Sequence, residues 1–162
     1  GTDVNVGGTI FTVQDPSSLL PGEFDCVIKS PGVRPTDERF VAKTAGTPVV
    51  SLTSLWMAEN WSNCVGVTGS KGKSTPSKLI HSLLTEFGVE AALGGHIGVP
   101  LSELSKDASL YVVELSSYQA QSLSDFSPRW AVLTSLFPDH LDWHGSQDGY
   151  FKDKLRIIGP TT

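Results

Sequence analysis

The residues best suited to chemistry lie in one short run, Thr68-Gly69-Ser70-Lys71-Gly72-Lys73-Ser74-Thr75. The run follows an apolar segment typical of a buried strand and precedes an amphipathic segment typical of a helix. In such a turn, backbone N–H groups and the helix N-terminus bind phosphate oxygens, and glycine lets the backbone approach the anion. Lys73 is placed to reach terminal phosphates, and the Ser74 hydroxyl is placed to bind Mg²⁺. The sequence therefore predicts a phosphate-binding site that also takes magnesium.

The run departs from the general P-loop pattern by one residue. That pattern requires a glycine five residues before Gly72, and Val67 stands there. The alternative is an ordinary strand–turn–helix junction with surface lysines. The intact Gly-Lys-Ser-Thr between a strand and a helix favours phosphate binding.

Strand and helix patterns alternate along the chain. They predict strands at 10–13, 24–29, 48–51, 64–67, 89–93, 110–115 and 130–136, and helices at 38–44, 52–60 and 74–87. The last two strand runs are nearly continuous in apolar residues, which is typical of parallel strands buried on both faces. We therefore expect an α/β protein with a small unit at 1–50, a connector at 51–63 and a larger unit at 64–162. Both ends of the chain are expected to be cut.

The composition of the 162 residues excludes several classes of protein. Hydrophobic residues make up 39% and charged residues 18%, as in soluble globular proteins. The net charge of −5 and the lack of a Lys/Arg-rich run argue against a nucleic-acid partner. No apolar stretch approaches the roughly 18 residues of a membrane span, and residues 1–8 are too polar for a signal peptide. We therefore expect a cytoplasmic protein whose Cys26 and Cys64 are buried thiols rather than a disulfide.

Five further segments join the phosphate turn in resembling the Mur ligases, the family that adds amino acids to nucleotide-linked muramic acid in bacterial cell-wall synthesis. They are Ser30-Pro31-Gly32, Gly94-Gly95-His96-Ile97-Gly98-Val99-Pro100, Val113-Glu114-Leu115-Ser116-Ser117-Tyr118-Gln119, Phe137-Pro138-Asp139-His140-Leu141-Asp142-Trp143-His144-Gly145 and residues 150–156. Six segments in family order are far more specific than any one of them. The absence of the early glycine also resembles the family's ATP loop.

The resemblance implies a fold and an activity. The fold is α/β, with a Rossmann-like N-terminal part followed by a P-loop-containing, mostly parallel-sheet central domain that is truncated here. Segments 114–119 and 153–157 are most similar to members that add glutamate to UDP-N-acetylmuramoyl-L-alanine. D-glutamate is expected, with L-glutamate as the alternative. Such a ligase uses ATP and Mg²⁺ and forms an acyl phosphate that the amine then attacks; we expect a monomer.

The matching positions imply the residues of the site. Residues 68–75 would bind ATP. The metal ligands would be Ser74, Glu114, His140 and Lys154, and the catalytic residues Lys73, His140 and Lys154. The substrate contacts would be Ser30, Gly32, His96, Ser116, Ser117, Gln119 and His140.

The chemistry of the acidic and imidazole groups leaves alternatives open. Glu114 ends a strand and offers Mg²⁺ an oxygen ligand, and its alternative role is that of a surface carboxylate. Histidine is an unusual magnesium ligand, so His140 is assigned to a second metal or to a substrate phosphate. Asp139 and Asp142 either orient the imidazole of His140 or cap the following turn.

Lys154 matches the lysine that carries a carbamate in the family. Carbamylation needs a neutral amine, and hence a pKa lowered by burial or by nearby positive charge. Judged by the sequence alone, Lys154 is one of several basic residues on a helix, with Lys152 and Arg156.

Two positions depart from the family's pattern, and two other functions are weighed. His96 stands where asparagine is usual, and Pro76 stands where threonine is common, in a first helical turn that tolerates proline.

The other functions are a non-catalytic nucleotide-binding module derived from a ligase and another P-loop enzyme such as a small kinase. Because the family's amino-acid-binding domain has no counterpart here, the chain alone is expected not to ligate glutamate.

Overall fold

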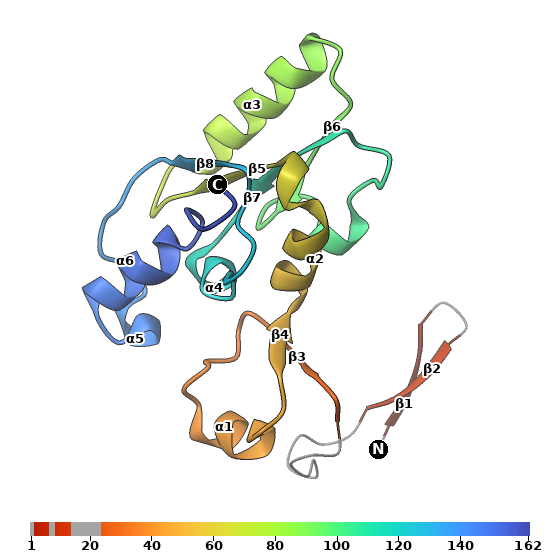
Figure 1. Cartoon of the computed structure of the whole chain (residues 1–162), viewed down its shortest axis with the longest axis vertical. Coiled ribbons are helices and arrows are strands. Elements are labelled where there is room, and N and C mark those ends of the chain that lie inside the picture. Colours follow the sequence, from red (N-terminus) through yellow and green to blue (C-terminus); the bar gives the residue numbers. More distant parts are fainter. Residues whose placement is uncertain (1, 7–8, 14–23) are drawn as a thin grey trace. The chain divides into compact units, whose positions relative to one another are not determined.

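The alternating strand and helix patterns produce an α/β fold, shown in Figure 1. The computed structural model describes residues 2–6, 9–13 and 24–162. The chain divides into two units, Gly1–Ile28 with Val33–Val49 and Lys29–Gly32 with Val50–Thr162. Part of the predicted N-terminal unit, residues 1, 7–8 and 14–23, lies outside the described residues.

The N-terminal unit contains a hairpin that the sequence predicted only in part. The predicted strand at 10–13 is β2 (Thr9–Val13), and it pairs antiparallel with β1 (Thr2–Val6). Helix α1 (Glu38–Thr44) has the predicted bounds and is followed by Gly46, whose φ of 78° suits the end of a helix. Strands β3 (Val27–Lys29) and β4 (Val49–Ser51) pair in a second two-stranded sheet.

The larger unit is built on a parallel sheet of four strands. They are β5 (Cys64–Thr68), β6 (Ala91–Gly95), β7 (Leu110–Glu114) and β8 (Trp130–Leu133), in the order β6-β7-β5-β8. The register pairs Val67 with Glu114 and Thr68 with Leu133. The carboxyl ends of the three strands β7, β5 and β8 therefore meet at one edge, where parallel α/β sheets bind their ligands.

The prediction that both long apolar runs are buried on two faces is right for β7 and wrong for β8. In β7 the last four residues are buried, whereas Trp130 at the start of β8 is 46% exposed and Leu133 at its end is 38% exposed. Within the described residues β8 pairs only with β5, so it is an edge strand. It is also shorter than predicted, ending at Leu133, and the next two residues, Thr134 and Ser135, bond to the phosphate turn.

The first four helices lie in connections between strands, and the last two follow β8. Helix α2 (Leu52–Asn60) begins at a capping box of Ser51 and Ser54, and α3 (Ser74–Glu86) follows the phosphate turn. Short 3₁₀ turns occupy Trp61–Asn63 and Leu101–Glu103. Helices α4 (Ser117–Ala120), α5 (Leu141–His144) and α6 (Gln147–Leu155) come later, and α4 and α5 pack against α6.

Helix α3 has nearly its predicted bounds, but three of the apolar side chains on which the prediction rested, Leu79, Leu83 and Phe87, are exposed. Pro76 lies in its first turn, where the missing N–H removes no helical hydrogen bond, and Gly88 follows it with a φ of 77°. The helix packs against β6 and β7, as Figure 1 shows. His81, on this helix, bonds through Nε2 to the carbonyl oxygen of Ala91 at 3.1 Å.

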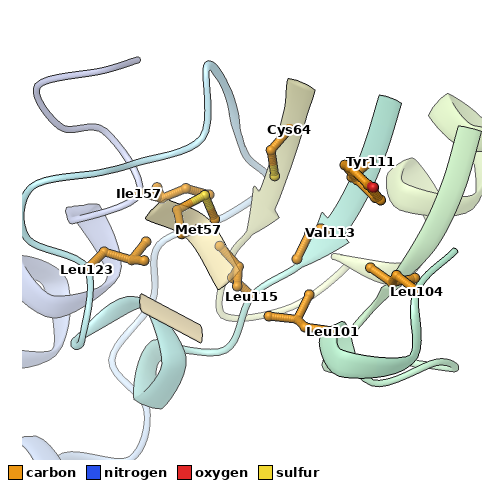
Figure 2. Close-up of a cluster of buried hydrophobic side chains, with 9 residues drawn as sticks. All are labelled: Met57, Cys64, Leu101, Leu104, Tyr111, Val113, Leu115, Leu123 and Ile157. Carbon is orange, nitrogen blue, oxygen red and sulfur yellow. The ribbon is translucent and has the colours of Figure 1, made fainter. Parts of the chain in front are cut away.

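The core lies between the sheet and its surrounding segments. Figure 2 shows its nine buried side chains: Met57, Cys64, Leu101, Leu104, Tyr111, Val113, Leu115, Leu123 and Ile157. Each large aliphatic side chain buried here contributes about 1.5–3 kcal/mol relative to its exposed state. The core joins residues far apart in sequence, and so it fixes the carboxyl ends of the strands.

Both cysteines are free thiols, as predicted, but only one is buried. Cys64 is fully buried, and that burial raises the pKa of its thiol. Cys26 is exposed, because it precedes the short strand β3 in a two-stranded sheet too small to cover it. None of the helices in the described part of the chain combines the length and hydropathy that a bilayer span requires.

Gly94 provides a test of the packing at the end of β6. A Cβ at this position would collide with the carbonyl oxygen of Val99 and lie 2.8 Å from Cδ2 of Leu104. We expect Gly94→Ala to lower the free energy of unfolding by about 1–3 kcal/mol, measured by urea denaturation. Gly32→Ala is the control, because its nearest neighbour would be Ser30 Oγ at 3.9 Å, and it should change stability by less than about 0.5 kcal/mol. Equal effects of the two substitutions would contradict this packing.

Candidate active site

The phosphate turn is fixed by the segment that follows β8. The N–H of Ser70 donates to the carbonyl oxygen of Ser135 at 3.0 Å, and the N–H of Lys71 donates to Ser135 Oγ at 2.9 Å. In return, Thr134 Oγ1 donates to the carbonyl oxygen of Lys71 at 2.7 Å. These bonds hold the turn in one shape before any anion binds, which lowers the cost of ordering it.

Glycine is required at two points of this turn. A Cβ on Gly69 would collide with Thr134 Oγ1, so a larger residue would push the two segments apart. Gly72 has a φ of 75°, a left-handed conformation that other residues rarely adopt. Gly69 therefore permits the close approach of Thr134, and Gly72 permits the left-handed turn, whereas the approach of an anion stays a prediction.

Two lysines converge on one carbonyl oxygen. Lys73 Nζ, at the start of α3, and Lys154 Nζ, on α6, each lie 3.0 Å from the carbonyl oxygen of Gly69. One neutral acceptor therefore receives hydrogen bonds from two ammonium groups of like charge. Such a place attracts an anion strongly, since an anion would relieve the repulsion between them.

Lys154 is buried and its amine is easily deprotonated. Its side chain is 2% exposed and lies over the ring of Tyr150, 4.9 Å from the centroid. Burial first, and then the ammonium of Lys73, lower the pKa of Lys154 from 10.5 to about 8, against an opposing effect of Asp139. This is the lowered pKa that carbamylation requires.

The burial of Lys154 has a measurable effect on stability. Because its pKa is lower in the folded state than in the unfolded state, unfolding takes up a proton between pH about 8 and 10.5, and stability rises with pH there. Below pH 8 both states are protonated and the penalty is fully present, roughly 3 kcal/mol from the pKa difference. We therefore expect the wild type to gain roughly that amount relative to Lys154→Met between pH 7 and 10.5, measured by urea denaturation in CO₂-free buffer. The difference between the wild type and Lys152→Met, which removes an exposed lysine of the same helix, should not change with pH. A difference between the wild type and Lys154→Met that also stays constant from pH 7 to 10.5 would refute the lowered pKa of Lys154.

The two lysines border a cleft of about 180 Å³. It is lined by eight residues that the sequence assigned to the site, Gly69, Ser70, Lys73, His96, Ser116, Ser117, His140 and Lys154. Three others complete the lining: Tyr118, Asp139 and Tyr150. The volume is below the roughly 300–1,000 Å³ of sites that enclose a whole small molecule, so the cleft suits the phosphate end of a nucleotide.

Other assigned residues lie outside this lining. They are Ser30, Gly32, Thr68, Lys71, Gly72, Ser74, Thr75, Glu114 and Gln119. Ser30 and Gly32 are exposed in a turn, where Ser30 Oγ accepts the N–H of Gly32 at 3.4 Å. The Thr68 hydroxyl is buried and donates to the carbonyl oxygen of Leu115 at 2.7 Å. Thr68 therefore anchors β5 and does not face the cleft.

Gln119 and Ser116 bond to each other. The side-chain oxygen of Gln119 accepts the N–H of Ser116 at 3.0 Å and its Oγ–H at 2.9 Å, and Ser116 Oγ caps the start of α4. This capping box places Ser116 and Ser117 directly beyond the end of β7.

Glu114 is the residue that best fits a cation. It is 2% exposed, and its Oε2 is buried without a hydrogen-bond partner. Leaving such an oxygen unsatisfied costs about 1–3 kcal/mol, which a bound cation would offset. No group of three His, Cys, Asp or Glu residues able to hold a metal occurs among the described residues. Mg²⁺ does not need one, since it typically keeps several waters and takes one or two carboxylates with substrate phosphates.

His140 lies at a strained position on the cleft wall. Its φ of 48° and ψ of 37° are left-handed, which is costly for a residue other than glycine and is found at functional sites. Asp139 Oδ1 accepts the N–H of His140 at 2.9 Å, and its Oδ2 lies 3.7 Å from Nε2 of the same residue. Asp139 therefore lies near the imidazole of His140, as one of the two roles weighed in the sequence requires, whereas α5 has no side-chain cap.

Sequence reasoning missed four residues of the site region. Tyr150 lines the cleft, and its hydroxyl lies 2.8 Å from Ser70 Oγ; desolvation raises its pKa. The sequence feature that could have identified Tyr150 is its position one helical turn before Lys154, which places both side chains on the same face of α6. Tyr118, His144 and Asp153 come from three different elements, and no spacing along the chain connects them.

Comparison with known proteins agrees with this geometry. The family model of the Mur ligase middle domain matches residues 67–161. Solved ligases share the fold at low identity. A UDP-N-acetylmuramate:L-alanyl-gamma-D-glutamyl-meso-diaminopimelate ligase from Neisseria meningitides has a TM-score of 0.54 at 22% identity, over 85% of this chain and 50% of that one.

Curated relatives are more similar in sequence. A UDP-N-acetylmuramoyl-L-alanine--L-glutamate ligase of a Micromonospora species is 51% identical over 141 residues, 85% of this chain and 31% of the relative. A UDP-N-acetylmuramoylalanine--D-glutamate ligase of Lactococcus lactis is 38% identical over 157 residues, 93% of this chain and 34% of the relative. The chain thus spans about a third of the length of the curated relatives that it matches.

Proposed function

We propose, from the premise that this chain belongs to the Mur ligase family, that it forms the nucleotide-binding part of a ligase adding glutamate to UDP-N-acetylmuramoyl-L-alanine in peptidoglycan synthesis. The named relatives act on that substrate and support the proposal. The sequence favoured D-glutamate, but the relative at 51% identity is an L-glutamate ligase and the one at 38% is a D-glutamate ligase. We therefore propose L-glutamate as the amino acid.

One observation carries the proposal: Lys73 and Lys154 converge on the carbonyl oxygen of Gly69. The reaction brings a carboxylate of the substrate to a phosphate of ATP, and both are anions. ATP supplies the phosphoryl group that activates the carboxylate. Positive charge fixed at the meeting point, supplied by Lys73 and by a bound Mg²⁺, is worth far more in a water-poor site than in water, and it costs no reorganisation during the reaction.

Each residue of the site has a role that follows from its position. Within the assigned ATP-binding residues 68–75, the N–H groups of residues 72–75 and the Lys73 ammonium would bind the phosphates, because the N–H groups of Ser70 and Lys71 already donate to Ser135. Ser74 and Glu114 would hold Mg²⁺, which supplies positive charge to the phosphate oxygens. His140, next to Asp139 in the cleft, would bind a substrate phosphate or a second cation. The assigned substrate contacts are Ser30, Gly32, His96, Ser116, Ser117 and Gln119.

Lys154 would act as a carbamate. Its neutral amine adds CO₂ and loses a proton, so a cation beside Lys73 becomes an anion and repulsion becomes attraction. The pKa of about 8 leaves enough neutral amine at physiological pH for this step. ¹³C NMR with labelled bicarbonate would detect the carbamate as a signal that Lys154→Arg abolishes.

The proposal also assigns parts of the chain. Residues 1–50 would belong to the domain that binds the UDP part of the substrate, and residues 64–162 to the ATP-binding central domain. We place the reaction in the cytoplasm, where ATP is available, and propose that the protein acts as a monomer.

Two measurements test the function. The chain itself should bind ATP in calorimetry only when Mg²⁺ is present. In a chimera where it replaces the matching segment of the Micromonospora ligase, phosphate release should require UDP-N-acetylmuramoyl-L-alanine and L-glutamate together. Nucleotide binding without turnover, in a chimera that folds, would favour a non-catalytic module instead. No ATP binding by the chain would reject the proposal.

A further inference from the structure

In the larger unit, a chain of hydrogen bonds joins α6, α5 and α4 and ends in the cleft. Asp153 Oδ2, on α6, lies 2.8 Å from Nδ1 of His144, and His144 Nε2 lies 3.1 Å from Ser117 Oγ. Ser117 lines the cleft, whereas the His144 side chain is 0% exposed. His144 and Asp153 have no role in the function proposed above, so this buried arrangement needs its own explanation.

The partners of Asp153 determine which ring nitrogen of His144 carries the proton. Asp153 Oδ2 also accepts Nε2–H of Gln121 at 2.8 Å, and its Oδ1 lies 3.6 Å from Nε of Arg156. A carboxylate surrounded by donors acts as an acceptor, so the Nδ1 of His144 must donate to it. In the neutral imidazole, Nε2 then holds a lone pair and accepts the hydroxyl proton of Ser117.

Aromatic packing fixes the orientation of the His144 ring. Tyr118 stacks on it at a centroid distance of 5.6 Å and an angle of 20°, and Tyr150 meets it edge-on at 5.3 Å. The ring is therefore enclosed by two residues of the cleft wall, and both of its hydrogen bonds are fixed in direction.

We propose that His144 is a positioning residue that turns the Ser117 hydroxyl into a pure hydrogen-bond acceptor for an N–H group of the substrate. With its proton directed at His144, Ser117 Oγ presents only lone pairs to the cleft. Lys73, which also lines the cleft, is a donor suited to anions. Ser117 therefore recognises the complementary feature, a donor carried close to an anionic group.

The substrate of the proposed function carries such a donor, and this step rests on that function. The amide N–H of its alanine residue is separated from the reacting carboxylate by a single carbon atom. With the carboxylate held beside Lys73, this amide is the substrate donor closest to the reacting group and would be the one offered to Ser117. The hydrogen bond would fix the rotation of the carboxylate as it meets the phosphate.

The tautomer can be tested without turnover. ¹⁵N NMR of the labelled chain should show His144 protonated at Nδ1 and unprotonated at Nε2. Asp153→Asn should shift the ring toward protonation at Nε2, because the amide N–H₂ can then donate to Nδ1. An Nε2–H tautomer in the wild type would overturn the proposal, whether or not the chain takes part in ligation.

The substrate contact is tested in the chimera. Replacing the substrate's amide by an ester, so that oxygen stands in place of N–H, should raise KM about tenfold, as expected for one neutral hydrogen bond. Ser117→Ala and His144→Phe should each raise KM for the amide by a similar factor, abolish discrimination against the ester, and not add to each other. His81→Phe is the matched control, since this histidine bonds to Ala91 outside the cleft, and it should keep full discrimination.

The outcomes separate the two proposals. If Ser117→Ala retains the wild-type preference for the amide, the positioning role is wrong even though ligation is intact. If the wild-type chimera folds but does not ligate, the proposed function fails, and the NMR result still decides the role of His144. Ser117→Ala removes one small atom, so it covers the case in which His144→Phe does not fold.

Discussion

Lys73→Ala is expected to weaken ATP binding about 100-fold, as measured by calorimetry with Mg²⁺. This is the loss of affinity expected when one strong charge-assisted hydrogen bond is removed. In the structure its ammonium lies 3.0 Å from the carbonyl oxygen of Gly69, at the mouth of the turn that binds phosphates. In the chimera the same substitution should lower kcat on the order of 10²–10³-fold, because the lysine stabilises charge that develops during phosphoryl transfer.

Lys78→Ala is the matched control for this substitution. Lys78 is an exposed lysine on the same helix, so it removes the same charge from the chain without touching the cleft. It should leave nucleotide affinity within about twofold of the wild type, which corresponds to less than 0.5 kcal/mol. Equal losses from Lys73→Ala and Lys78→Ala would mean that only net charge matters, and the assigned contact would be wrong.

Lys73→Ala has a second, independent consequence. The ammonium of Lys73 lowers the pKa of Lys154, so removing it should raise that pKa. Less neutral amine would then be present at neutral pH, and the carbamate signal in ¹³C NMR should weaken. The two lysines would thus be shown to be coupled without any measurement of turnover.

The elements that the sequence predicted well are those specified by local pattern. Helix α3 needs only its apolar spacing, its first-turn proline and Gly88, and all three lie within 15 residues. Strand β8 was predicted too long, because the apolar run continues past Leu133. The chain leaves the ladder there for a tertiary reason, since the Thr134 hydroxyl bonds to the carbonyl oxygen of Lys71.

The part of the site that lies at the ends of the strands could be predicted from the sequence. The family resemblance assigned Lys73, Glu114, His140 and Lys154 to one site. Lys73, His140 and Lys154 do line one cleft, whereas Glu114 is buried at the end of β7 outside its lining. The shared partner of Lys73 and Lys154, the carbonyl oxygen of Gly69, was not foreseen, because it depends on the fold bringing α6 against the turn. The bonds from Asp153 through His144 to Ser117 join three separate helices, and pairings of this kind leave no periodic signal in the sequence.

Glu114→Gln is expected to separate stability from function. Glu114 Oε2 is buried without a hydrogen-bond partner, so the folded chain carries a cost of about 1–3 kcal/mol when no cation is bound. An uncharged side chain of the same shape should reduce that cost and raise the thermal unfolding temperature without Mg²⁺. The same change should abolish the gain in ATP affinity that Mg²⁺ produces in the wild type, and lower kcat of the chimera on the order of 10³-fold.

The opposite signs of these two effects make the test decisive. A substitution that merely damaged the fold would lower both stability and nucleotide affinity, whereas removal of a cation ligand raises the first and lowers the second. Glu90→Gln supplies the control, because Glu90 is an exposed glutamate just before β6 and its loss should change neither quantity. Calorimetry of ATP binding with and without Mg²⁺ gives the affinity, and thermal unfolding of the nucleotide-free chain gives the stability. If Glu114→Gln keeps the full Mg²⁺ dependence of ATP binding, the buried carboxylate is a structural feature of β7, and the metal must be held by other residues.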